Sequence, residues 1–192
     1  QDVIELTRPY AKVRVVATDL HELNLNVKPA SVKVVYNAHN ANTFNAVEGT
    51  ISGTYAEREF DYVYTDPHVY TAGKDAETTT TVNGDVRNTH MTLFTDYILA
   101  GDEQTAISFD MTVFEDAACT NPIKATSFNT NIPIQRNYLT TIIGNVLTTG
   151  TEIEVTINDN FTNGTEWNPE EDEFDIAIWD GKSAKEPTKE IG

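Results

Sequence analysis

The chain has 192 residues, and its 30 Asp and Glu residues against 13 Lys and Arg residues give a formal net charge of −17. This charge argues against binding to nucleic acid or to an anionic membrane surface, because both need cationic patches that neutralise phosphate. The single cysteine, Cys119, excludes an internal disulfide framework, a cysteine-based zinc site and a Cys-x-x-Cys redox pair.

The composition is typical of a β-rich protein found outside the cytoplasm. The sequence holds 28 threonines and 17 asparagines but only five serines. Threonine is β-branched and suits a pleated, half-exposed surface, whereas asparagine suits turns. The longest apolar runs have four or five residues, whereas roughly 20 are needed to span a bilayer. No membrane-spanning segment is therefore expected.

Seven segments carry the apolar and polar patterning of β-strands. Most of them alternate in polarity, whereas one is apolar in both phases, which indicates a central strand covered on both faces. Gly144 is expected to bend the longest segment, or to permit close backbone approach or a bulge. In chain order the predicted strands are 11–17, 31–36, 59–64, 90–99, 107–113, 131–147 and 152–157.

Strands that follow one another without intervening helices favour an antiparallel sandwich over a parallel sheet. Helical signal is confined to 18–25, where Thr18 would cap one or two turns. The predicted fold class is therefore all-β, with one core between two sheets. The residues expected in that core are Val13, Val15, Val34, Leu93, Phe109, Met111, Ile134 and Val155.

Two long stretches lack strand patterning. Residues 66–88 contain an Asn83–Gly84 turn signal and form either a solvated insertion or a binding loop. Residues 159–192 hold ten acids and three lysines, and are too polar to pack a core of their own. This shift in composition predicts a sandwich domain over 1–161 and an acidic tail over 162–192.

The predicted tail contains one alternating segment, in which Phe174, Ile176 and Ile178 share one phase of an extended strand. Alternate apolar side chains on an extended backbone are what strand addition to another sheet requires. The same pattern also fits pairing with this domain's own edge strand, or a linker to a further domain. All three interpretations stay open.

Motifs with catalytic or cofactor chemistry were sought without success. No two of His21, His39, His68 and His90 have the helical i, i+4 spacing of a metal-binding pair. Cys119 lies in a polar loop with acids nearby, which does not favour a reactive thiolate. We therefore expect no enzymatic activity, no cofactor and no metal. The competing hypothesis is a pair of carboxylates that meet across a cleft, as in glycoside hydrolysis.

Three stretches resemble the fimbrillin family of Bacteroidota, the subunits of type V pili and related surface proteins. They are LTRPYAKVRV at 6–15, IPIQRNYLTTIIGNVLT at 132–148 and IEVTINDNF at 153–161. Their order and spacing also match. Within the second stretch, Arg136 and Asn137 interrupt an apolar run, so both should face solvent or satisfy backbone groups at a strand bend.

The resemblance implies a transthyretin-like sandwich of about seven strands, equivalent to the second of two domains that fimbrillins normally have. It implies a structural or adhesive module at the cell surface, anchored to the outer membrane through a region outside this chain. The partners it implies are other surface-protein or pilus subunits, joined by strand addition. A host protein or a glycan is a further candidate partner.

The alternative from another class is a carbohydrate-binding module of a surface glycan-acquisition system. Such a module stacks exposed aromatic rings on sugar faces. Tyr55, Tyr62, Tyr64 and Tyr70 cluster near the 66–88 stretch and are the candidate ligand-facing rings. Three coplanar exposed rings would support this hypothesis, and rings buried in the core would count against it.

Overall fold

The structure is a computed structural model, and it describes residues 8–37, 41–53, 61–70 and 78–158. The candidate partner-strand residues Phe174, Ile176 and Ile178 lie outside the described residues, as do Tyr55 and His39. No helix in the described ranges is long and apolar enough to cross a membrane.

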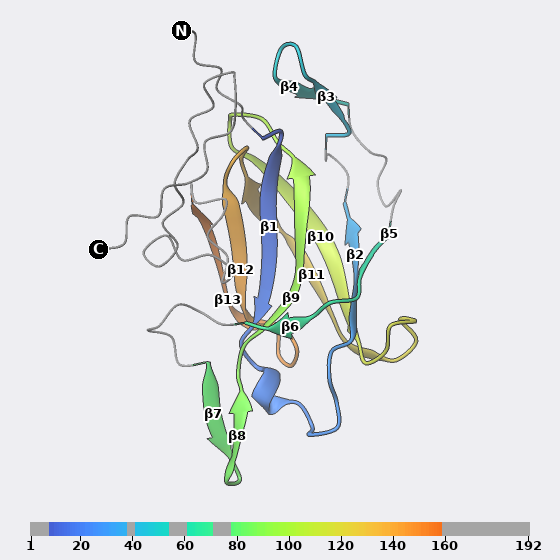
Figure 1. Cartoon of the computed structure of the whole chain (residues 1–192), viewed down its shortest axis with the longest axis vertical. Coiled ribbons are helices and arrows are strands. Elements are labelled where there is room, and N and C mark those ends of the chain that lie inside the picture. The colour runs from blue at the N-terminus through green and yellow to red at the C-terminus, as the bar shows by residue number, and fades with distance from the viewer. Residues whose placement is uncertain (1–7, 38–40, 54–60, 71–77, 159–192) are drawn as a thin grey trace, which may run out of the picture.

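The fold is all-β, as predicted, and its strands form two main sheets and two small hairpins (Figure 1). The strands are β1 (Tyr10–Ala17), β2 (Ser31–Tyr36), β3 (Thr43–Asn45), β4 (Thr50–Ser52), β5 (Asp61–Tyr64), β6 (His68–Val69), β7 (Thr79–Val82), β8 (Asp85–Asn88), β9 (Met91–Leu99), β10 (Thr105–Phe114), β11 (Pro122–Ile134), β12 (Leu139–Asn145) and β13 (Thr151–Asn158).

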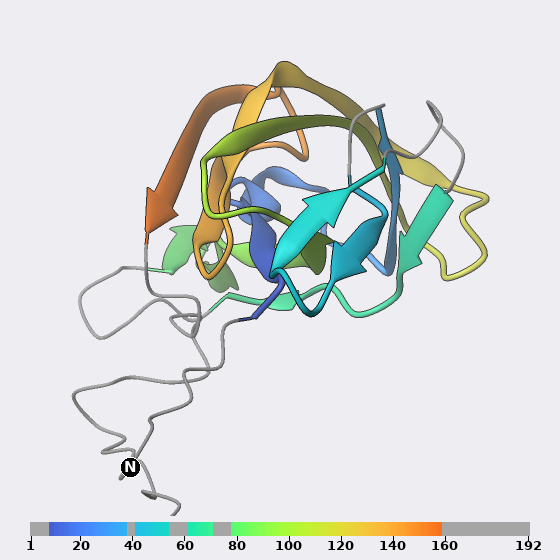
Figure 2. The same ribbon diagram turned by 90° about the horizontal axis from the view of Figure 1, so that it is seen from above.

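The two main sheets pack face to face as a β-sandwich (Figure 2). The first sheet has the order β13-β12-β1-β9-β6, and the second has the order β11-β10-β2-β5. Strands β1 and β12 pair in parallel, whereas the other neighbours pair antiparallel. The first strand of the domain therefore lies in the middle of its sheet, between β9 and β12.

Alternation places one apolar face of each central strand between the sheets. Phe109 of β10 lies at the centre of this core, with its ring centroid 5.6 Å from Tyr36, 5.8 Å from Phe94 and 4.8 Å from Phe128. Seven of the eight predicted core residues are buried, and those are Val13, Val15, Val34, Leu93, Phe109, Met111 and Ile134.

The prediction for the eighth core residue, Val155, is wrong, because its side chain is 36% exposed. Val155 pairs with the buried Ile142, so it faces the same side of the sheet as the core. It lies in β13, however, which is the edge strand of the first sheet among the described residues. Alternation identified the correct face of the strand but not its place at the edge of the sheet.

The predicted strand 131–147 is two strands, β11 and β12, which belong to different sheets. The chain reverses at 135–138 rather than bending at Gly144. The prediction that Gly144 permits close approach of two backbones is confirmed, because a Cβ at this position would lie 2.6 Å from the carbonyl oxygen of Glu152. The β12–β13 register shifts between Ile143 and Asn145, which is where this approach occurs.

The predicted helix over 18–25 is only the short 3₁₀ helix η1 (Leu20–Glu22), and Thr18 does not cap it. Residue Asp19 precedes η1 and is fully buried. Its carboxylate accepts hydrogen bonds from the backbone N–H groups of Leu147 and Thr148 and from the Thr148 hydroxyl. This carboxylate therefore joins the start of η1 to the turn after β12.

The 66–88 stretch contains strand β6 and the β7–β8 hairpin. The Asn83–Gly84 turn signal is confirmed, since both residues have positive φ, of 53° and 91°. This is the backbone that an Asn-Gly hairpin turn requires.

Candidate functional site

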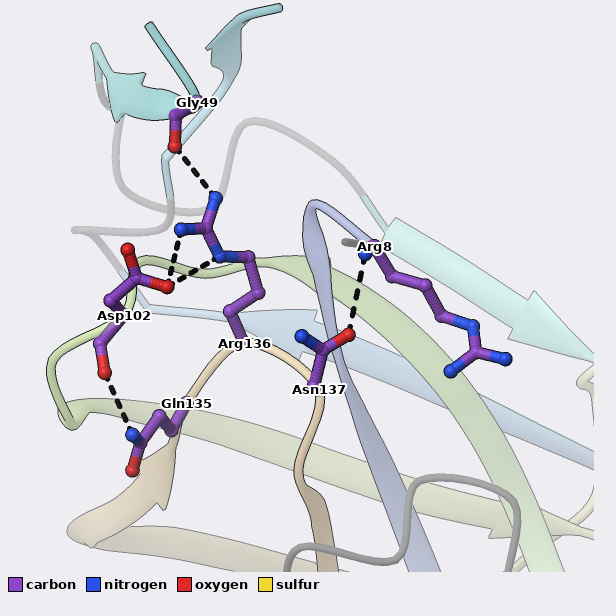
Figure 3. Close-up of polar contacts among 6 residues, drawn as sticks. All are labelled: Arg8, Gly49, Asp102, Gln135, Arg136 and Asn137. Carbon is purple, nitrogen blue, oxygen red and sulfur yellow. Dashed lines mark hydrogen bonds and ion pairs between the residues drawn. The ribbon is translucent and has the colours of Figure 1, made fainter. Parts of the chain in front are cut away.

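The Arg136–Asn137 pair lies in the turn between β11 and β12, at the end of the sandwich where β1 begins (Figure 3). The Arg136 side chain is buried, and its Nε donates a 2.8 Å hydrogen bond to Oδ1 of Asp102. Nη2 forms an ion pair with the same oxygen, and Nη1 donates a 2.6 Å hydrogen bond to the carbonyl of Gly49. One guanidinium thus joins the turn after β9 to the tip of the β3–β4 hairpin.

Backbone and side-chain bonds strengthen this connection. The N–H of Arg136 donates to the carbonyl of Gly101 at 2.9 Å, and Nε2 of Gln135 donates to the carbonyl of Asp102 at 2.7 Å. Asn137 adopts a positive φ of 66°. Its N–H donates to the carbonyl of Tyr10, so the start of β1 is tied to the same turn.

Gly49, Gly101, Asp102, Gln135, Arg136 and Asn137 together form what we call the Arg136 corner. The prediction that Arg136 and Asn137 satisfy backbone groups at a bend is confirmed. Of the two alternatives, solvent exposure does not apply to Arg136, because its side chain is buried. Hydrogen bonds from Arg136 lower the pKa of Asp102, whose side chain is 79% exposed. All three guanidinium nitrogens have protein partners, so the corner positions loops rather than binding a ligand.

The Arg136 corner supports the β3–β4 hairpin, which has an ordered tip. Oδ1 of Asn45 accepts hydrogen bonds from the backbone N–H groups of Val47 and Glu48. The N–H of Gly49 donates to the carbonyl of Asn45 at 2.8 Å. These bonds present Val47, which is 96% exposed, at the end of the hairpin.

Of the candidate ligand-facing tyrosines, two lie on β5, and one of them, Tyr64, packs against the sandwich core. Tyr62 and Tyr64 pair with the buried Val34 and Val32, so both face the other sheet. The Tyr64 ring stacks on Phe94 with centroids 4.8 Å apart. Tyr62 meets the ring of Tyr36 edge-on at 5.7 Å and stays 38% exposed. Tyr64 is therefore a packing residue, in contrast to the ligand-facing role predicted for it.

A half-buried carboxylate that sequence reasoning missed lies beside Tyr36 and Tyr64. The Tyr36 hydroxyl donates a 2.7 Å hydrogen bond to Oδ2 of Asp96, which projects from β9 towards the second sheet. Burial raises the pKa of both Tyr36 and Tyr64, and the negative charge of Asp96 raises them further. Asp96 interrupts the apolar 90–99 segment, and this interruption was the signal available in the sequence.

Tyr70 lies apart from Tyr62 and Tyr64, after β6. Its ring stacks on His90 at 6.0 Å, and the Arg14 guanidinium lies 5.2 Å from its centroid. Burial lowers the pKa of both Arg14 and His90. Arg14 also donates a hydrogen bond to the Thr141 hydroxyl. The described tyrosines thus occupy two separate environments, and a ligand-facing role for Tyr62 and Tyr70 stays a prediction.

The edge strand β13 is the described segment that directly precedes residues 159–192. Its alternate side chains Ile153 and Ile157 are half-buried and flank the exposed Val155. Among the described residues, β13 pairs through its backbone with β12 along one of its two hydrogen-bonding edges. In the described part of the chain, no cluster of three or more His, Cys, Asp and Glu residues could hold a metal ion.

A model described as a family of unknown function (DUF6562) matches residues 1–185, which is nearly the whole chain. A search of curated proteins found no match.

Proposed function

The chain belongs to the DUF6562 family, and we propose that it is a non-enzymatic structural or adhesive module of the cell surface that joins its partners by β-strand addition. The resemblance of 6–15, 132–148 and 153–161 to fimbrillins supports this proposal, and so does the sandwich fold that the resemblance implies. A transthyretin-like arrangement of the sandwich is part of the same proposal.

The observation that carries the proposal is the edge strand β13. It presents Val155 at 36% exposure on the core-facing side of the sheet. An extended partner that pairs with this edge would place its own alternate side chains beside Val155, with Ile153 and Ile157 on either side. Backbone hydrogen bonds then supply affinity, and every second side chain supplies specificity.

The Arg136 corner adds a second argument, from rigidity. A module that transmits load or presents a loop needs its connections fixed, and one buried guanidinium fixes three of them here. The corner also holds the β3–β4 hairpin with its exposed Val47. We propose that this hairpin is a contact surface of the adhesive module.

The donor that we propose is the segment containing Phe174, Ile176 and Ile178. The test mixes a fluorescent peptide spanning 170–182 with the full chain carrying Ile176→Asp, so that the chain's own segment does not compete. We expect binding by fluorescence anisotropy, and loss of binding when the peptide itself carries Ile176→Asp. A peptide carrying Ala177→Asp is the matched control, because residue 177 lies in the opposite phase and should tolerate the charge.

A second pair of variants identifies the acceptor. Val155→Lys should weaken peptide binding, because a charged side chain at an edge opposes strand pairing. Val86→Lys introduces the same charge at an exposed valine of β8, and should leave binding unchanged. Failure of the wild-type peptide to bind, or equal effects of the two lysines, would contradict strand addition at β13.

A further inference from the structure

A pocket is lined by residues of η1, of the segment that follows it and of the β7–β8 hairpin. This hairpin lies at the opposite end of the sandwich from the β3–β4 hairpin, whose tip Arg136 binds (Figure 1). The pocket is open to solvent and has a volume of about 520 Å³. We call it the hairpin pocket, and the lining residues used below are Glu22, Asn24, Leu25, Val82, Asn83 and Arg87. Sites for small ligands have volumes of about 300–1,000 Å³, so the pocket has room for one or two sugar rings.

The walls of the hairpin pocket are fixed by long-range contacts. Nη1 of Arg87 donates a 3.2 Å hydrogen bond to the carbonyl of His21, which joins the hairpin to η1. The N–H of Leu20 donates to the carbonyl of Thr89 at 3.0 Å. The buried carboxylate of Asp19 holds the start of η1 to the turn after β12. The pocket is therefore part of the folded framework.

Arg87 is the charged group that distinguishes this pocket. Its one hydrogen bond among the described residues is to a neutral carbonyl, and in that part of the chain it forms no ion pair. Its Nε is closed to solvent and has no hydrogen-bond partner among the described residues. The same residues provide no acidic partner for Arg87, which lies at the wall of the pocket. The Nη groups of such a guanidinium suit the carboxylate of a ligand, which they can bind through two parallel hydrogen bonds.

The other lining groups suit hydroxyl groups and a carbon face. The amides of Asn24 and Asn83 both donate and accept hydrogen bonds. The carboxylate of Glu22 lies 3.1 Å from the Thr148 hydroxyl, whose single proton is shared with the nearer Asp19, and its lone pairs can accept from ligand hydroxyls. Leu25, which is largely exposed, and Val82 offer apolar surface. One cation, several hydroxyl-binding groups and an apolar patch match the chemistry of a sugar that carries a carboxylate.

We propose that the hairpin pocket binds a carboxylated sugar residue, such as a hexuronic acid, with its carboxylate on Arg87 and its hydroxyls on Asn24, Asn83 and Glu22. This site is independent of strand addition at β13, which involves the edge of the first sheet and not the β7–β8 hairpin. It also uses none of the tyrosines that the sequence suggested for sugar binding.

The test is a titration of the isotopically labelled full chain with sodium D-glucuronate, followed by backbone amide NMR shifts. D-glucose and sodium propionate are the controls, because each supplies one half of the proposed chemistry. We expect shifts at 20–25 and 82–87 with glucuronate. Affinity should be about tenfold lower or worse for glucose, which lacks the charge-assisted pair with Arg87, and for propionate, which lacks the hydrogen bonds of the sugar hydroxyls.

Matched variants assign the site to its residues. Arg87→Met should weaken glucuronate binding by about tenfold or more, whereas Lys28→Met removes the same charge from an exposed position outside the pocket and should have no effect. Arg87→Lys keeps the charge but loses the planar fork, and should give an intermediate loss; it also serves if the methionine variant does not fold. Asn83→Gly keeps the positive-φ turn and removes only the amide, so binding should weaken by about fivefold.

Three results would overturn the proposal. The first is the absence of shifts at 20–25 and 82–87 at glucuronate concentrations on the order of 50 mM, far above the millimolar range of weak specific binding. The second is equal binding of propionate and glucuronate, which would leave no role for the sugar. The third is an equal effect of Arg87→Met and Lys28→Met on glucuronate binding, which would show that binding depends on the overall charge of the protein and not on the pocket.

Discussion

Arg136 and Arg87 lie at opposite ends of the sandwich and differ in what surrounds their guanidinium groups. Arg136 is buried, and all three of its nitrogens have partners in other loops. Arg87 is half-buried, and among the described residues it makes one hydrogen bond, to a carbonyl, while its Nε has no partner there. The same side chain therefore fixes loops at one end and is available to a ligand at the other. What decides between these roles is how many of the guanidinium N–H groups already have partners within the protein, rather than burial alone.

The core between the two ends should give the largest effect on stability. Phe109→Ala removes the ring that contacts Tyr36, Phe94 and Phe128, and should lower the free energy of unfolding by about 3–5 kcal/mol. Because both sheets depend on this ring, amide exchange should accelerate at both ends of the sandwich. Acceleration confined to one end, measured by hydrogen exchange, would show that the ends do not share one core.

Removal of the saturated arginine should rank second. Arg136→Met leaves the Gly49 carbonyl and Asp102 without their charged donor, and should cost about 2–4 kcal/mol in urea denaturation. Arg87→Met is the matched control and should cost less than about 1 kcal/mol, since the side chain is only half-buried. The two variants thus separate stability from binding. A larger loss of unfolding free energy for Arg87→Met than for Arg136→Met would contradict the roles assigned to the two arginines.

The hairpin pocket has a structural anchor of its own in Asp19, whose loss should have a smaller effect. Asp19→Ala leaves the N–H groups of Leu147 and Thr148 without their acceptor, at a cost of about 1–3 kcal/mol. Hydrogen exchange should accelerate at 20–25 and stay unchanged at the Arg136 corner. Acceleration at the corner as well would mean that the two ends are coupled through the sheets.

The smallest effect should be a dependence on acid pH. The pKa of Asp102 is lowered by hydrogen bonds from Arg136, and that of Asp116 by backbone N–H groups, first of Asn121 and then of Thr120 and Ala118. Both carboxylates therefore stabilise the folded chain above the ordinary aspartate pKa of about 4, and this stability disappears as pH falls through the lower folded pKa values. Tm measured from pH 5 downward should fall less steeply for Asp102→Asn. An unchanged slope would show that the exposed pair contributes nothing.

The polarity pattern of the sequence was sufficient to predict the strands that have the same surroundings along their whole length. Alternation identified β1, β2 and β10, and the apolar segment 90–99 identified the central β9. The Asn83–Gly84 turn followed from backbone preference alone. Strand β11 was largely missed, because its residues before the predicted 131–147 strand are mostly polar, and its pairing with β10 does not depend on a regular apolar alternation.

The candidate sites depend on contacts that sequence spacing does not reveal. Arg136 binds a carbonyl 87 residues earlier, and the Asp19 carboxylate binds an N–H 128 residues later. The sequence identifies Arg136 as an interruption of an apolar run, but the position of Gly49 depends on the whole sandwich. The hairpin pocket likewise needs η1 and the β7–β8 hairpin to meet, although the turn signal in the hairpin is local.

The position of β1 in the middle of its sheet has a consequence for synthesis of the protein. One of its two neighbours, β12, is parallel to it, and the two strands are about 127 residues apart, as the bond from Thr18 to Asn145 shows. At roughly 5–20 residues per second, the ribosome needs about 6–25 seconds to make this intervening chain. During that interval β1 has no completed sheet to enter, and its apolar face depends on other protection from aggregation. Pairing between such distant strands also makes the fold rich in non-local contacts, so refolding should take milliseconds to seconds.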